Sequence, residues 1–250
     1  MVAEPTVGDI YRRAFKTYFE RFGLVAGTAA IVFGPLGFLE GLTSQWAYQF
    51  EDEHDTFVGL LVALAVFAGS SALILGSTFY AGYLDRVIGE HQYGDTHQSP
   101  REALRTLPYT RLVVASLIVG AVVSIGLALF VVPGLIALTL LAIVGPAINV
   151  EGHGVVSALR RSVELTRRFP RQTFVAVTLP VVVESFVSDA IEAALLHDAP
   201  LLVAGIIGAL IAATAGAIVG LTEVSLAFQL ITHDNASQTG TARAARQTPA

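Results

Sequence analysis

The sequence lacks the residues and motifs on which most known enzyme chemistries depend. Its 250 residues include no cysteine, which excludes disulfides, thiolate metal sites and cysteine nucleophiles. No HExxH zinc pattern, glycine-rich phosphate loop or GxSxG nucleophile elbow occurs along the chain. The 6 histidines fall in loops or at segment boundaries, without the spacing of metal ligands. We therefore expect a non-enzymatic protein that holds no metal and uses no cofactor.

Charge is also scarce, and apolar residues take its place. Only 14% of the residues are charged, 54% are hydrophobic, and the mean hydropathy is +0.65. A helix needs roughly 20 apolar residues to cross a bilayer core of about 30 Å. We expect an all-α fold, a polytopic six-helix transmembrane bundle in one domain over 1–232, with a disordered cytoplasmic tail at 233–250. The predicted spans are 22–42, 57–84, 111–131, 133–150, 172–194 and 201–232.

The third and fourth spans are predicted to form a tight hairpin. The stretch from Arg111 to Val150 is almost uncharged and too long for a single crossing. Pro133 and Gly134 supply the break, because proline cannot continue the preceding helix yet suits the first turn of the next one.

Basic residues mark one side of the predicted membrane domain. All 15 lysines and arginines lie before the first span, after the last, or in the two loops on that same side. The positive-inside rule makes this side cytoplasmic. We therefore expect a multi-pass protein of the cell membrane with both termini in the cytoplasm. Because the basic segments are short and flank the membrane, nucleic-acid binding has no support.

Three cytoplasmic segments have apolar residues at helical spacing and predict amphipathic interfacial helices. They lie over 6–22, 99–107 and 155–169. Such helices either bind anionic lipid headgroups or provide only the ordinary anchoring of basic residues at the inner surface. Membrane lipids with anionic headgroups are thus the expected partners. The candidate ligands are Arg12, Arg13, Arg160, Arg161, Arg167 and Arg168.

Two carboxylates lie well inside the apolar runs. Glu184 is near the middle of the fifth span, and Ser188 follows it by one helical turn. Glu223 is in the inner half of the sixth span. Ionisable residues inside a membrane are costly and mark ion or proton pathways by default. The competing interpretation is structural, with a protonated Glu184 hydrogen-bonded to a neighbouring helix, and the sequence favours neither.

Small residues recur every four positions along the sixth span and form a ridge. Such a ridge lets a second helix approach closely. The second helix belongs to this chain, to another copy of it or to a membrane protein partner, and the packing needs of six spans favour the first. The ridge consists of Ala204, Gly208, Ala212, Gly216 and Gly220.

The stretch from 131 to 170 carries a recognisable pattern. It contains Pro-Gly, then Pro, then Glu-Gly, then Ala-Leu before Arg161 and Ser162. This pattern resembles that of a broad set of six-span proteins of unknown function, related to the membrane domain of some glycerophosphodiester phosphodiesterases. The resemblance implies a multi-pass helical module and no phosphodiesterase chemistry. The motif residues are Pro133, Gly134, Pro146, Glu151, Gly152 and Ser162.

Two functions from different classes follow from these features. The first is a membrane module that organises lipids or partner proteins, indicated by the basic helices. The second is a small transporter or permease that uses Glu184, with or without Glu223, as an intramembrane ion or proton site. We expect the first, because the chain has three basic cytoplasmic segments with helical spacing and no catalytic motif.

Overall fold

The fold is known from a computed structural model that describes residues 6–49, 76–84, 87, 100–191, 194 and 199–247. Within these ranges every regular element is helical, which confirms the predicted all-helical fold class. The predicted count of six spans is not confirmed, because 57–75 lies outside the described residues and 172–194 is not among the apolar helices found. Four described helices are long and apolar enough to cross a membrane: Phe22–Gln45, Tyr109–Leu129, Val131–Asn149 and Leu201–Ala236.

The predicted fifth span is helical but interrupted. α9 (Pro170–Thr173) leads into a π-helical turn, η2 (Phe174–Thr178), which continues as α10 (Leu179–Ile191). Pro180 has no N–H and its ring displaces the carbonyl of the preceding turn. The helix widens there, and Leu179 N–H donates to Phe174 O.

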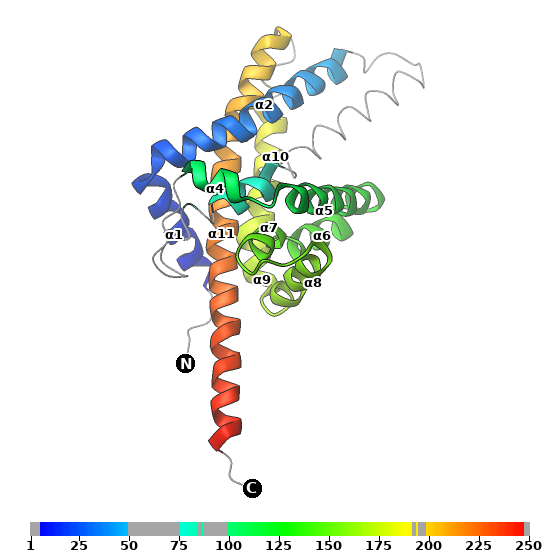
Figure 1. Cartoon of the computed structure of the whole chain (residues 1–250). Helices are drawn as coiled ribbons and strands as arrows, with labels where there is room; N and C mark the ends of the chain where they lie inside the picture. Colours follow the sequence, from blue (N-terminus) through cyan, green and yellow to red (C-terminus); the bar gives the residue numbers. More distant parts are fainter. Residues whose placement is uncertain are drawn as a thin grey trace.

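α11 (Leu201–Gln247) is a long helix that passes through the centre of the described structure (Figure 1). Every residue from 219 to 227 is buried, so other elements surround the helix at that level. Its last part projects beyond the rest of the body (Figure 1). Residues 233–247, expected to begin a disordered tail, are therefore helical. No proline interrupts them, and alanine and arginine favour the helix.

α2 (Phe22–Gln49) lies directly against α11, backbone to backbone. A Cβ atom added to Gly41 would lie 2.5 Å from Ala204 O, and one added to Gly37 would overlap Ala212 Cβ. Gly208 faces the backbone of Gly37 and Gly41 in turn. The predicted ridge therefore packs within the chain, and glycines on both helices make the close approach possible.

The rest of the ridge makes room for aromatic rings. Gly216 faces the ring of Phe33, and Gly220 faces the ring of Tyr80, which lies in the helical segment 76–84. The Tyr80 hydroxyl donates to Val25 O at 2.8 Å. This bond ties 76–84 to α2 at the level where both contact α11.

α5 (Tyr109–Leu129) and α6 (Val131–Leu140) form the predicted hairpin. Phe130 between them is extended, with φ −157° and ψ 141°. Pro133 lies in the first turn of α6, where a missing N–H costs no helical bond. A Cβ on Gly126 would lie 2.9 Å from Gly134 Cα, so both glycines allow the close turn. Figure 1 shows α5 running crosswise to α11, so the described helices are not all parallel.

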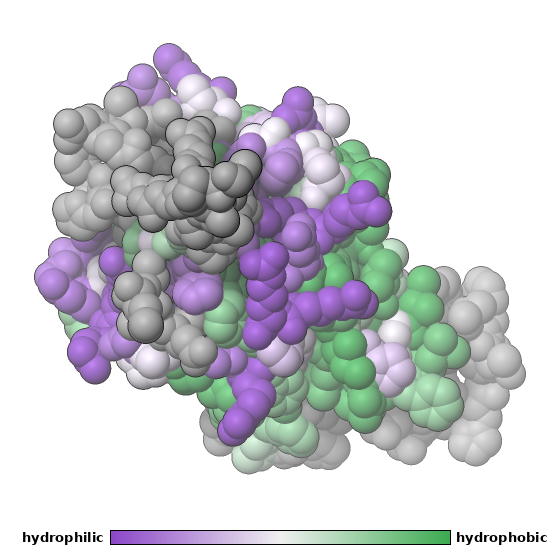
Figure 2. Space-filling view, turned by 90° about the horizontal axis from the view of Figure 1, so that it is seen from below, coloured by the Kyte–Doolittle hydropathy of each residue, from purple (hydrophilic) through white to green (hydrophobic). Residues whose placement is uncertain are grey.

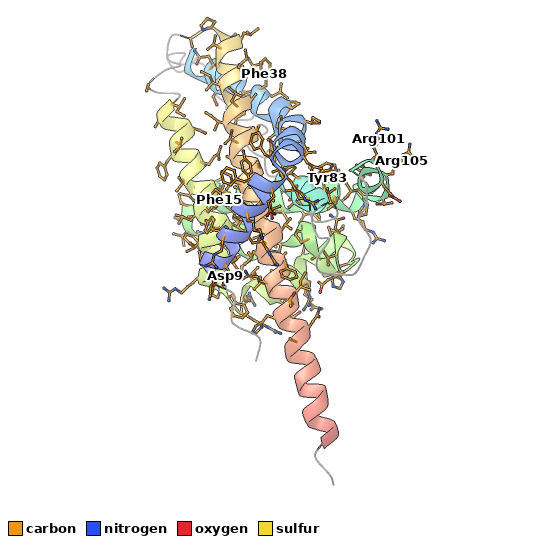
Figure 3. The ribbon with its side chains drawn as sticks, turned by 90° about the vertical axis from the view of Figure 1, so that its left-hand side faces the viewer. Asp9, Phe15, Phe38, Tyr83, Arg101 and Arg105 are labelled. Carbon is orange, nitrogen blue, oxygen red and sulfur yellow. The ribbon has the colours of Figure 1, made fainter. Side chains whose placement is uncertain are left out.

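α1 (Val7–Glu20) has apolar residues facing in two directions. Ile10 and Ala14 are buried in the core, whereas Phe15 is 45% and Phe19 73% exposed. Figure 3 shows Phe15 on α1 beside α11. The predicted interfacial helix thus packs one face on the protein and exposes phenylalanines on another. Its location at the membrane surface stays a prediction.

The remaining described helices connect these parts. α4 (Pro100–Thr106) precedes α5, and α7 (Val144–Asn149) follows α6 after a turn at 141–143. α8 (Val155–Thr166) carries the basic cluster and leads to α9.

We predict that Gly37→Ala lowers the free energy of unfolding by about 1–3 kcal/mol, because the new methyl group overlaps α11. Gly27→Ala on the same helix is the matched control, since a Cβ there meets nothing within 4 Å. Helix propensity alone makes that change neutral or stabilising by up to about 1 kcal/mol. Thermal unfolding in detergent micelles compares the two, and equal midpoints would contradict the close α2–α11 contact.

Candidate functional site

Several motif residues between 131 and 170 shape the turns that connect α6, α7 and the basic helix α8. Pro146 has no N–H to donate to Ala142 O, which favours the turn between α6 and α7. Gly152 has φ +70°, a left-handed conformation that favours glycine, and it turns the chain from α7 towards α8. Ser162 Oγ donates to Leu140 O at 2.8 Å and accepts from Ile143 N–H at 3.3 Å. This serine therefore supplies hydrogen-bond partners to a backbone carbonyl just before the turn at 141–143 and to the backbone N–H of its last residue.

A charged network joins the loop before α8, α8 itself and α11. Arg161 Nε and Nη2 donate to the carboxylate of Glu151 at 2.9–3.2 Å. Arg161 Nη2 also lies 2.9 Å from Asp234 Oδ2, and Arg168 Nη1 donates to Asp234 Oδ1. The Asp234 side chain is 2% exposed and that of Arg161 14%. The hydrogen bonds that Arg161 donates to Glu151 raise the pKa of Arg161, so this mostly buried guanidinium stays charged.

The four arginines of the α8 segment divide into two pairs with different surroundings. Arg161 and Arg168 bind Asp234, and both also lie within 4 Å of Glu164, at 3.8 and 3.7 Å. Arg160 and Arg167 are exposed. Within the described part of the chain, neither of these two has a hydrogen bond or ion pair to a carboxylate. The pairs therefore differ in their partners, since Arg168 is 46% exposed but bound to Asp234, whereas Arg160 and Arg167 have no carboxylate partner among the described residues.

Arg160 and Arg167 open on a groove of about 820 Å³ between α8, α5 and the end of α6. Glu164 lies on α8 between the two arginines and also lines the groove. The groove thus joins an apolar wall to a cationic rim. The apolar wall consists of Ile118, Val122, Leu141, Leu159 and Val163.

The two arginines of α1 are differently placed from the α8 pairs. Arg12 is exposed and lies 3.5 Å from Asp9 in a surface ion pair. The guanidinium of Arg13 lies over the ring of Phe228, 4.2 Å from its centroid, which ties α1 to α11. Neither lines the groove beside α8.

The two carboxylates predicted to lie inside the membrane have different surroundings among the described residues. Glu184 lines a groove of about 510 Å³ between α10 and α11, whose other lining residues are almost all apolar. It accepts a long hydrogen bond, 3.4 Å, from Ser188 Oγ. Glu223 is buried in α11 and does not line this groove. A shared ion site of Glu184 and Glu223 is thus not formed by this groove.

Among the residues that the structure describes, no group of three or more histidine or acidic side chains is placed to hold a metal ion. The histidines at 91 and 97 lie outside the described residues.

Sequence reasoning missed Asp234. It was placed in the predicted tail, although it contacts two arginines some seventy residues earlier in the chain, at a separation of 66 from Arg168. The one available signal was a lone acidic residue at the inner end of the last apolar run.

No family model, no curated protein and no solved structure matches this chain. The relation to the membrane domain of glycerophosphodiester phosphodiesterases therefore stays a prediction.

We predict that Asp234→Asn lowers the free energy of unfolding by about 2 kcal/mol, because two guanidinium groups lose their charged acceptor in a mostly buried site. Glu20→Gln is the control, since its partner Lys16 lies at 3.8 Å in an exposed pair worth at most about 0.5 kcal/mol. Thermal unfolding of the two variants in detergent measures the difference. An Asp234 variant as stable as the control would mean that the network does not clamp α8 to α11.

Proposed function

We propose that this protein is a non-enzymatic integral membrane module that binds anionic lipid headgroups at its cytoplasmic face. The observation that carries the proposal is the division of the α8 arginines, in which Arg161 and Arg168 are held by Asp234 while Arg160 and Arg167 are left open beside an apolar groove. Arginines that only anchor a helix at the membrane surface need no apolar groove beside them, so the groove favours the binding of a lipid.

The surface around α8 has the character that lipid binding requires. Figure 2 views the structure from the end towards which α11 projects and shows hydrophilic side chains gathered beside a large apolar surface. Anionic lipids are attracted to juxtamembrane lysine and arginine by about 1 kcal/mol per residue. The positive-inside rule supports the cytoplasmic assignment of this face, with both termini on the same side.

The transporter alternative has weaker support. It requires a polar path through the membrane, whereas Glu184 lies in a largely apolar groove and Glu223 lies elsewhere on α11. Ser188 Oγ donates to Glu184 from one turn further along the same helix, as in a structural hydrogen bond. We therefore retain lipid binding as the function.

The relation to the phosphodiesterase membrane domain belongs to the proposal as well. It is carried by the sequence pattern alone, and in this chain two residues of that pattern, Gly152 and Ser162, shape the turns around α8.

We predict that the full chain, reconstituted in phosphatidylcholine, associates about threefold or more strongly with spin-labelled phosphatidylglycerol than with spin-labelled phosphatidylcholine. The preference should fall at high salt, because the attraction is electrostatic. Electron paramagnetic resonance of the immobilised lipid fraction gives the ratio. Equal association of both lipids at low salt would contradict the proposed function.

A further inference from the structure

The groove beside α8 combines an apolar wall with two arginines at its rim. We propose that it holds an anionic glycerophospholipid, with the phosphate bound by the guanidinium groups of Arg160 and Arg167 and an acyl chain along Ile118 and Val122 of α5. This inference rests on the proposed function and deepens it, because it assigns one site and one class of ligand in place of a general attraction to the membrane surface.

The two arginines line the same groove. They lie on the same face of the α8 segment, about two helical turns or about 10 Å apart along the axis. Both side chains are long, and guanidinium groups suit the planar, bidentate recognition of phosphate oxygens. Among the described residues this pair has no carboxylate partner, and the phosphodiester oxygens of a lipid would supply the missing negative charge.

Glu164 does not neutralise the pair. It lies between the two arginines, but its carboxylate oxygens are 3.8 Å from Arg161 and 3.7 Å from Arg168. Those two arginines are in turn held by Asp234. Glu164 therefore has its ion pairs with Arg161 and Arg168, and the two rim arginines outnumber this single carboxylate, so the rim of the groove keeps a net positive charge.

The apolar wall distinguishes a lipid from a soluble phosphate ester. Ile118 is 37% and Val122 44% exposed, although both are large aliphatic residues. The wall continues into the exposed side of the α5–α6 hairpin, where Leu117 is 59% and Ile125 58% exposed. Covering such a surface with an acyl chain is favourable, whereas a free phosphate ester would leave it uncovered. The volume of about 820 Å³ lies within the usual range for ligand sites.

The test compares two double variants of the full chain in nanodiscs, with bound phosphatidylglycerol counted by native mass spectrometry. Arg160→Gln with Arg167→Gln removes the proposed phosphate ligands. Arg101→Gln with Arg105→Gln removes the same charge from α4, where both side chains point away from the body (Figure 3). We expect the first variant to bind phosphatidylglycerol about tenfold more weakly and the second to change by less than about twofold. Equal losses in both variants, or no loss in the first, would overturn the site.

A third variant and a soluble probe test the acyl-chain wall. Val122→Trp fills the groove from an exposed position without altering charge. We expect it to weaken phosphatidylglycerol binding severalfold and to leave the thermal midpoint unchanged, while glycerol phosphate binds the native chain far more weakly than the lipid does. Unchanged lipid binding in Val122→Trp, or tight binding of glycerol phosphate, would show that no acyl chain occupies the groove.

The outcomes also separate this inference from the proposed function. If the native chain shows no preference for phosphatidylglycerol, the proposed function fails and the site fails with it. If the preference is present but survives in the Arg160→Gln, Arg167→Gln variant, lipid binding stands and only the groove is excluded.

Discussion

The arrangement of the described helices depends on the direct contact between α2 and α11. At Gly37, Gly41 and Gly208 the two backbones meet without intervening side chains. Helices in a membrane gain no hydrophobic free energy from leaving lipid for one another, so close van der Waals packing must hold them together. This contact places α11 in the centre of the structure, where every residue from 219 to 227 is buried.

The position of α11 in turn determines the chemistry of the basic face. Its C-terminal part brings Asp234 against the α8 segment, where the carboxylate binds Arg161 and Arg168. A buried carboxylate with two guanidinium partners fixes the rotation of α8 about its own axis. That rotation turns Arg160 and Arg167 towards the groove along α5. One contact deep in the membrane domain is thus connected, through a single helix, to the proposed lipid site at its surface.

Much of the fold follows from the sequence by simple physical rules, and the site follows only in part. The hairpin at Pro133 and the packing of the ridge within the chain were predictable, because proline chemistry and small-residue spacing act locally. The roles of the four α8 arginines were not predictable, since they depend on Asp234, which is distant in sequence. The helical continuation of α11 through Gln247 was missed because a polar composition indicates a solvated segment without excluding helix. The separation of Glu223 from the groove that Glu184 lines likewise depends on tertiary packing.

The central claim is that the α8 groove holds a lipid, and a photoreactive phosphatidylglycerol tests it most directly. With the reactive group on the acyl chain, irradiation of the reconstituted full chain followed by peptide mass spectrometry locates the bound chain. The account predicts preferred labelling at Ile118, Val122 and Val163, which line the groove. Labelling spread evenly over the exposed hairpin tip at Leu129 and Phe130, with no preference for the groove, would contradict it.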